Sequence, residues 1–96
     1  MMKIFKTQRA LKEHLSSIEE KLVVGFAPTM GSLHEGHLSL IRESKKRCDI
    51  VVCSIFVNPT QFNVVSDFEN YPKDYFKDIE LLKSAGCDVL FLPNDV

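Results

Sequence analysis

The sequence has no tryptophan, few cysteines and no long apolar run, and the last two shortages exclude whole classes of protein. No uninterrupted apolar stretch approaches the roughly 20 residues of a membrane-spanning helix, and residues 1–6 lack the apolar region of a signal peptide. The three cysteines, Cys48, Cys53 and Cys87, show no C-x-x-C spacing, which argues against a metal centre or a disulfide scaffold. We therefore expect a cytoplasmic chain with buried free thiols and no membrane partner.

A charge excess of one sign is also missing. Twelve basic and thirteen acidic residues give a net charge of -1, and the two signs are interspersed along the chain. A nucleic-acid-binding protein usually carries a basic face, so nucleic acid is not an expected partner. With 45% hydrophobic and 26% charged residues, the 96-residue chain is typical of one small globular domain.

The hydrophobic pattern predicts strands and helices in alternation. Thr7 offers a hydroxyl cap for the first helix, and Gly86 stands where a helix commonly ends. The expected elements are a short edge strand at 3–5, a helix to about Glu20, a buried strand at 22–27, a helix from His34 or Gly36 to Arg47, a strand at 50–57, a helix from about Asp74 to Ala85 and a strand at 89–92.

The strand at 50–57 is almost entirely apolar, which predicts burial on both faces and hence a parallel sheet covered by helices. Right-handed crossovers would place the strands that begin at Leu22, Ile50 and Val89 in the order 3-2-1, the first half of a doubly wound Rossmann-like sheet. The strand at 22–27 would lie at the edge here, although a complete fold buries it centrally. Because an apolar edge tends to pair, we expect self-association or marginal stability of the isolated chain.

Two histidines stand at the turn between the strand at 22–27 and the following helix. His34 and His37 are three residues apart, so both rings can reach one ligand beside the first helical turn. A helix N-terminus attracts phosphate, and the nearby Gly31 and Gly36 allow an anion to approach the backbone. The sequence thus indicates nucleotide chemistry; the alternative is that the histidines only cap the helix.

The segment His34-Glu35-Gly36-His37 resembles the His-x-Gly-His motif of nucleotidyltransferases and class I aminoacyl-tRNA synthetases. The longer segment from Pro28 to His37 resembles the pantothenate synthetase (pantoate-beta-alanine ligase) family. A second segment, Ser54 to Phe62 followed by Asp67-Phe68 and Tyr71-Pro72-Lys73, is similar to the next block of that family. The resemblance runs over residues 1–96 and covers the N-terminal part of the family's ATP- and pantoate-binding domain.

The resemblance implies a ligase that condenses pantoate with beta-alanine through a pantoyl adenylate and releases pyrophosphate and AMP. It makes His34 and His37 the catalytic residues, with His37 the better proton donor, and assigns pantoate and beta-alanine to Gln61, with Met30 and Asn58 in support. It also implies a homodimer, and Mg²⁺ that no dedicated site in this chain holds. The implied ATP-binding residues are Met30, Gly31, Ser32, Leu33, His34, Glu35, Gly36 and His37; Glu35 is given no catalytic role.

Simpler roles stay open for several of these residues. Asn58 can stabilise a turn before a proline, and Met30 can fill a gap in the core. Tyr71 can belong to a mobile wall of the site or be a surface aromatic. The residues 63–66 and Lys73 depart from the family pattern, and the family's later ATP-contacting segments lie beyond residue 96. We therefore expect the chain alone to be inactive. The alternative functions are another nucleotidyltransferase and a non-catalytic nucleotide-binding or dimerisation module.

Overall fold

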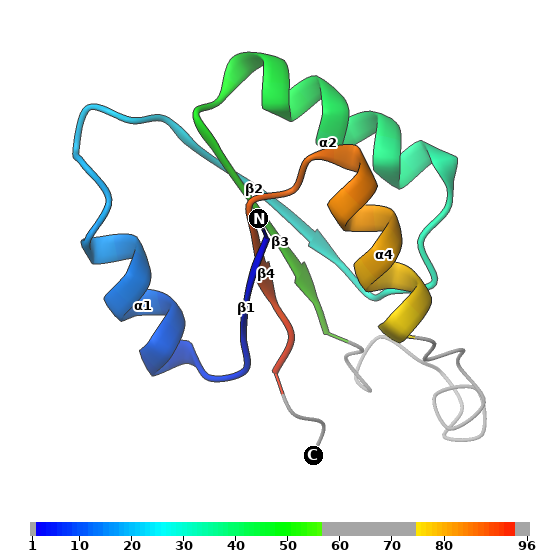
Figure 1. Cartoon of the computed structure of the whole chain (residues 1–96), viewed down its shortest axis with the longest axis horizontal. Helices are drawn as coiled ribbons and strands as arrows, with labels where there is room; N and C mark the ends of the chain where they lie inside the picture. Colours follow the sequence, from blue (N-terminus) through cyan, green and yellow to red (C-terminus); the bar gives the residue numbers. More distant parts are fainter. Residues whose placement is uncertain (1, 57–74, 94–96) are drawn as a thin grey trace, which may run out of the picture.

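The computed structural model describes residues 2–56 and 75–93, which form one parallel sheet with helices on both faces (Figure 1). The strand order is β1-β4-β3-β2, so the predicted order of the three main strands is confirmed and the short first strand lies at the opposite edge. The elements are β1 (Lys3–Phe5), α1 (Gln8–Ser16), β2 (Val24–Thr29), α2 (Glu35–Arg47), β3 (Ile50–Ile55), α4 (Tyr75–Ala85) and β4 (Val89–Phe91).

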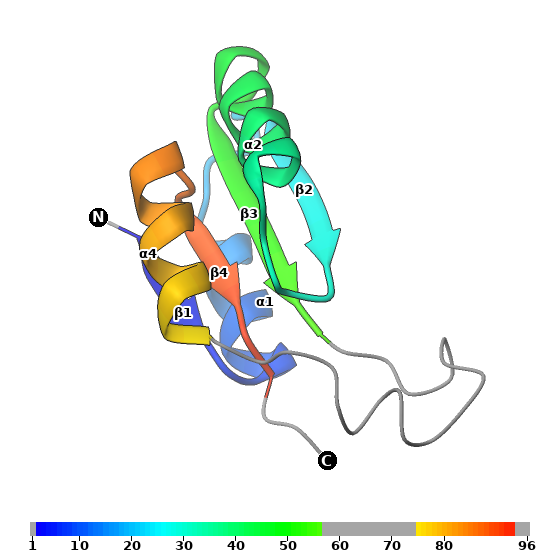
Figure 2. The same cartoon turned by 90° about the vertical axis from the view of Figure 1, so that its right-hand side faces the viewer.

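The core lies between the sheet and the helix pair α2 and α4, which pack against each other on one face (Figure 2). Leu38 and Ile41 of α2 and Leu82 of α4 are buried against β3. Residues 51–55 of β3 are all buried, which confirms the prediction of a central strand covered on both faces. Burial of these aliphatic side chains is the main force that holds the helices to the sheet.

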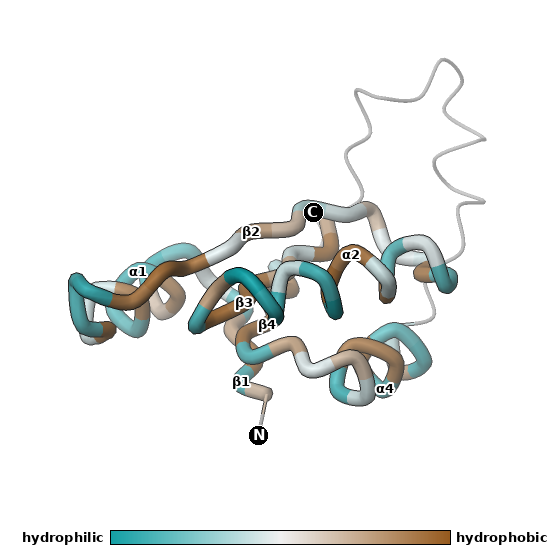
Figure 3. Tube along the Cα trace, turned by 90° about the horizontal axis from the view of Figure 1, so that it is seen from above, coloured by the Kyte–Doolittle hydropathy of each residue, from teal (hydrophilic) through white to brown (hydrophobic). Residues whose placement is uncertain are grey.

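The other face of the sheet is covered less completely. Helix α1 lies there and has no buried residue, although Ala10, Leu11 and Leu15 of its apolar stripe are half-buried (Figure 2). Phe26 of β2 remains 62% exposed and Phe56, just after β3, 41% exposed. The stretch that leads into β2 is strongly hydrophobic and exposed (Figure 3). Strand β2 therefore has an unpaired edge among the described residues and a partly open apolar face.

Several predicted boundaries were wrong; β3 and β4 end at Ile55 and Phe91 instead of residues 57 and 92. The strand expected at 22–27 is half-exposed and shifted to Val24–Thr29, because Val23 already bonds to the turn before β3 through Asp49 while Pro28 is tolerated at a sheet edge. Helix α1 ends at Ser16 instead of Glu20, since Ser17 caps it and both serine hydroxyls bond back to carbonyl groups of the last turn.

The predicted start of α1 and end of α4 are confirmed. Thr7 Oγ1 accepts the N–H of Ala10 at 3.1 Å and so caps α1. Gly86 ends α4 with φ of +92°, and the amides of Gly86 and Cys87 bond to Lys83 O and Leu82 O in the paired pattern of a Schellman motif. The three cysteines are free; Cys53 and Cys87 are buried, and Cys48 is half-buried. In the described part of the chain, no helix has the length and apolar character needed to cross a membrane.

Candidate functional site

The site begins where β2 ends, at the carboxyl edge of the sheet. Thr29 donates its hydroxyl to Ser54 O of the neighbouring strand at 2.9 Å and accepts the N–H of Gly31 at 3.2 Å. Gly31 and Ser32 then adopt left-handed backbone conformations, with φ of +83° and +51°. A left-handed serine is uncommon, so this turn is held by its surroundings and not by local preference.

The two histidines cap helix α2 reciprocally. His34 Nδ1 accepts the N–H of Gly36 at 3.0 Å, and His37 Nδ1 accepts the N–H of His34 at 3.1 Å. The ring centroids lie 4.1 Å apart at an interplanar angle of 47°, so the expected pairing of the rings is confirmed geometrically. Capping and ligand binding are compatible here, because each ring uses Nδ1 for the cap and carries its neutral-state proton on Nε2.

Gly36 is needed because the His34 ring lies directly against it. A Cβ at position 36 would stand 2.8 Å from His34 Cε1 and 3.0 Å from His34 Nδ1. Any side chain here would push the imidazole away from its capping position. The glycine of the motif therefore serves the placement of the first histidine.

Most backbone amides of the turn are already used within the chain. The amide of Gly31 bonds to Thr29 Oγ1, and the amides of His34, Gly36 and His37 bond within the cap. An incoming anion therefore cannot rely on these N–H groups without breaking internal bonds. Neutral histidines instead offer two adjacent Nε2–H donors at the positive end of the helix dipole.

The environment of His37 favours its neutral form. Partial burial lowers the pKa of His37 from its ordinary value of 6.5, the adjacent His34 lowers it further, and the carboxylate of Asp78 acts in the opposite direction. At neutral pH the ring is thus an uncharged hydrogen-bond donor. A bound phosphate would raise the pKa again by stabilising the imidazolium.

Asp78 is a member of the site that the sequence analysis missed. Its side chain is only 2% exposed, and its carboxylate accepts the amide of Ser32 at 3.0 Å and the amide of Leu33 at 2.9 Å. The signal lay in the helical pattern: in α4 this acid occupies the apolar stripe that contains Ile79 and Leu82. A charged residue on such a stripe demands buried partners.

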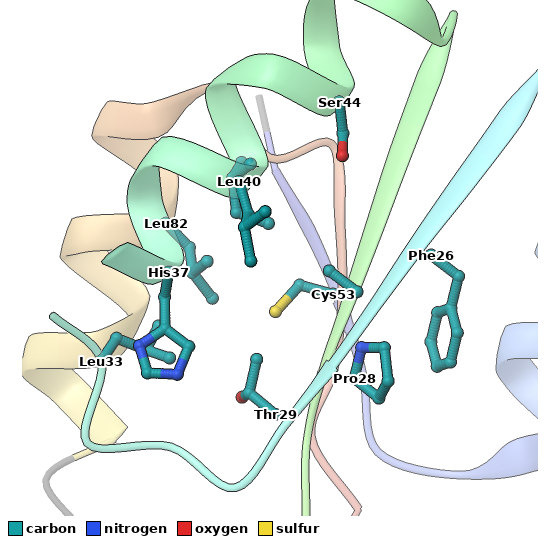
Figure 4. Close-up of a pocket in the computed structure, with 11 residues that line it drawn as sticks. Phe26, Pro28, Thr29, Leu33, His37, Leu40, Ser44, Cys53 and Leu82 are labelled. Carbon is teal, nitrogen blue, oxygen red and sulfur yellow. The ribbon is translucent and has the colours of Figure 1, made fainter. Parts of the chain in front are cut away.

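A cavity of about 270 Å³ lies beneath His37, between α2 and β2 (Figure 4). Thr29, Leu33, Leu40 and Cys53 are among its lining residues, and most of the others are apolar as well. Burial, reinforced by Cys87, raises the pKa of the Cys53 thiol to about 12, so this sulfur stays protonated and is a poor nucleophile. The cavity is better suited to an apolar group than to a phosphate.

The structure brings Met30 to His37 together in one turn, with Met30 half-buried. Asn58, Gln61 and Tyr71 lie outside the described residues. Phe56, the last described residue before them, donates its amide to Thr29 O at 3.0 Å, beside the start of the turn. No cluster of three or more His, Cys, Asp or Glu side chains within 2–56 and 75–93 could hold a metal ion.

Comparison with known proteins identifies the family of this chain. The model of the pantoate-beta-alanine ligase family matches residues 3–96. The chain belongs to this family. Curated relatives include the pantothenate synthetases of Acinetobacter baumannii, 60% identical over 72 residues, and of Thermotoga petrophila, 48% identical over 94 residues. These alignments cover 75% and 97% of this chain, but 26% and 34% of the relatives.

Solved structures support the same assignment. The pantoate-beta-alanine ligase of Francisella tularensis, complexed with beta-gamma ATP and beta-alanine, superposes with a TM-score of 0.93 at 44% identity. The pantothenate synthetase of Thermus thermophilus gives 0.82 at 41% identity. Each match covers 97% of this chain, and 36% and 32% of the respective neighbours. The predicted parallel α/β fold and the predicted family are thereby confirmed, and the chain spans about a third of the length of these ligases.

Proposed function

We propose that this chain forms the N-terminal part of the Rossmann-like domain of an ATP-dependent ligase that joins pantoate to beta-alanine. The observation that carries the proposal is the reciprocal cap of His34 and His37, which uses Nδ1 of each ring and leaves Nε2 outside the cap, with the ring centroids 4.1 Å apart. Family membership and the Francisella neighbour, solved with ATP and beta-alanine, support the choice of substrates.

The first step of the proposed reaction needs charge stabilisation. A pantoate carboxylate oxygen forms a bond to the ATP α-phosphorus, the bond from that phosphorus to the bridging oxygen breaks, and pyrophosphate leaves. His34 and His37 donate hydrogen bonds to phosphate oxygens as negative charge shifts toward the leaving group. We give the proton-donating role to His37 on the basis of the family. An imidazole that binding pushes toward the imidazolium can release a proton to a departing phosphate oxygen.

In the second step the beta-alanine amine attacks the acyl carbon of the pantoyl adenylate, and AMP leaves as the amide forms. We assign the pantoate hydroxyl and the neighbouring beta-alanine to Gln61, whose amide group can both donate and accept, with Met30 and Asn58 in support. The family implies Mg²⁺ with the nucleotide. Asp78, the buried carboxylate that contacts the turn from Met30 to His37 (the histidine turn), already accepts two amides. We therefore place the ion on the nucleotide and not on a protein site of its own.

Two further properties belong to the proposal. In the chain alone, the exposed apolar side chains of β2, Val24 at 42% and Phe26 at 62% exposure, would be covered by self-association. The homodimer of the complete ligase is proposed from family membership. We also propose a cytoplasmic location, where ATP is available to the enzyme.

A different function has one observation in its favour. Because the chain spans 26 to 36% of the length of the relatives described above, residues 1–96 by themselves suit a nucleotide-binding or dimerisation module without catalysis. The other alternative is a nucleotidyltransferase of different specificity. In that case a substrate other than pantoate, such as a phosphate ester, would bind at Gln61.

Pyrophosphate release separates these functions. The complete gene product that contains residues 1–96 is expected to release pyrophosphate from ATP only when pantoate is present, and AMP with pantothenate when beta-alanine is added. Pyrophosphate release that requires a phosphate ester instead of pantoate would support the alternative nucleotidyltransferase. ATP binding without release under either condition would support the non-catalytic module.

A further inference from the structure

Asp78 is the most deeply buried charged side chain among the described residues, and the chemistry above does not use it. It enters from α4, 46 residues along the chain from Ser32, and it is 2% exposed. A buried carboxylate destabilises the fold unless its oxygens are hydrogen-bonded. The hydrogen-bond partners of Asp78 therefore indicate its role.

Both partners are backbone amides of the histidine turn. Oδ2 accepts from Ser32 at 3.0 Å and Oδ1 accepts from Leu33 at 2.9 Å, so one carboxylate binds two successive N–H groups. Successive amides in a left-handed turn form a concave anion site, and here the protein fills that site with its own side chain. A Cβ at Gly31 would lie 3.2 Å from Oδ2, which shows how closely the turn wraps the carboxylate.

Leu33 connects the Asp78 carboxylate to the two histidines. Leu33 is 8% exposed and packs in the core, and the next residue, His34, is the N-cap of α2. A shift of the Leu33 amide therefore moves His34, and through the reciprocal cap it moves His37. The turn carries a left-handed serine that local preference does not favour, so a fixed outside partner is required to hold it.

We propose that Asp78 is the positioning residue of the histidine pair: it clamps the turn so that both Nε2 atoms face the same phosphate. This proposal rests on the proposed function for the meaning of that geometry, although the clamp itself does not. The residue touches neither ring by a hydrogen bond and so acts through the backbone.

The charge of Asp78 gives the clamp an independent signature. The groups that face His37 electrostatically are His34 on its own cap and Asp78 from α4; the former lowers the pKa of His37, and the latter raises it. Removing the carboxylate charge should therefore lower the pKa of His37 further. This titration reports the charge of Asp78 near the ring, whereas the Ser32 and Leu33 amides report the clamp itself.

The test uses Asp78→Asn, which keeps the size of the side chain but offers one acceptor oxygen in place of two. We expect the Ser32 and Leu33 amide resonances to move upfield and exchange faster with solvent, and the His37 titration to move to lower pH. In the complete gene product we expect kcat for pantoate-dependent pyrophosphate release to fall on the order of 100-fold, the scale of a misplacement of about 1 Å.

Glu80→Gln is the matched control, because it removes a carboxylate from the same helix at an exposed position paired with Lys83. It should leave both amides, the His37 titration and kcat unchanged. An Asp78→Asn protein that matches this control in all three readouts overturns the proposal.

Asp78→Glu decides the case in which Asp78→Asn does not fold. The longer carboxylate keeps the charge but displaces the turn, so the His37 titration should stay near that of the unmodified chain while kcat falls. Unchanged kcat in Asp78→Glu contradicts the clamp. The nuclear magnetic resonance measurements contain no nucleotide, so they test Asp78 even where the unmodified protein lacks pantoate-dependent activity and the proposed function fails.

Discussion

The starts of helices α1 and α2 solve the same problem in different ways. Helix α1 begins with Thr7, whose hydroxyl accepts the amide of Ala10, and this cap needs no help from the rest of the protein. Helix α2 begins with two imidazoles, a glycine in its first turn and a left-handed serine before it. A buried carboxylate from α4 binds the amide of that serine and the amide of the next residue.

The difference separates stability from function. Threonine is among the residues that helix starts favour, whereas histidine is not, and glycine inside a helix costs about 0.5–1 kcal/mol relative to alanine. A protein selected for folding alone would replace such a start with a serine or an aspartate. Local choices that oppose stability tend to mark functional sites, and here they gather at the two Nε2–H donors.

The largest expected effect comes from His37→Asn in the complete gene product. Asparagine can supply the capping acceptor in place of Nδ1 but has no counterpart of Nε2–H. We expect kcat for adenylate formation to fall by about 100- to 1,000-fold, the usual cost of a lost donor to a developing charge, with little change in the free energy of unfolding. Pantoate-dependent pyrophosphate release measures the first quantity and urea denaturation the second.

Near-normal pyrophosphate release by His37→Asn would show that His37 only caps α2, as Thr7 caps α1. His14→Asn is the control, because that ring packs on Phe5 with centroids 5.0 Å apart and lies outside the site.

Gly36→Ala should weaken ligand binding without weakening the fold. The new Cβ would stand 2.8 Å from His34 Cε1 and push the ring aside, while alanine is the better helix residue. We expect ATP affinity to fall on the order of 10-fold, equivalent to about 1.4 kcal/mol. Stability should change little, because the helix propensity gained with alanine offsets the weakened His34 cap. Calorimetry with ATP and thermal denaturation report the two effects.

Ser39→Ala is the matched change for this test, since it improves helix propensity at an exposed position of α2 away from the rings. Equal ATP affinities in Gly36→Ala and Ser39→Ala would contradict the explanation given for the glycine.

Thr7→Ala should show the opposite pattern. Loss of the hydroxyl leaves the Ala10 amide without its capping acceptor, which costs about 1 kcal/mol of stability. ATP affinity should not change. Urea denaturation of Thr7→Ala beside Thr7→Ser, which retains the hydroxyl, measures the effect, and a loss of ATP affinity would show that the two helix starts are coupled.

The smallest expected effect is on the pH dependence of stability. The pKa of His37 is lower in the folded chain than its ordinary 6.5, first because of burial and then because of His34, so the unfolded state binds more protons between the two values. Stability from this group is therefore complete above pH 6.5 and declines as the pH falls through the folded-state pKa. Urea midpoints between pH 7.5 and 5.5 should fall more in the unmodified chain than in His37→Asn; equal declines would show that another group is responsible.

Sequence periodicity was sufficient for most of the fold, because each element carries its own local signal. Strand β3 is a continuous apolar run, Thr7 and Gly86 mark helix ends, and the chirality of crossovers fixes the strand order. The start of β2 was misplaced because its boundary depends on Asp49, a residue 26 positions away from Val23. Pro28 also concealed the continuation of the strand to Thr29.

The site was only partly predictable for the same reason. The spacing of His34 and His37 brings the rings together within one helical turn, and this local feature was found. Asp78 lies 46 residues from Ser32 in the sequence, and the residues around it do not indicate that it binds the amides of Ser32 and Leu33. Gln61 and Asn58 lie outside the described residues, so their roles remain proposals from the family.

The imidazole nitrogens themselves give the most direct test of the paired donors. In the complete gene product labelled with ¹⁵N-histidine, we expect His34 and His37 to carry their protons on Nε2 at pH 7.5. Addition of ATP should shift both Nε2 resonances while those of His14, on α1, stay fixed. Protons on Nδ1 in the free protein, or ATP-induced shifts that spare His34 and His37, would contradict this expectation.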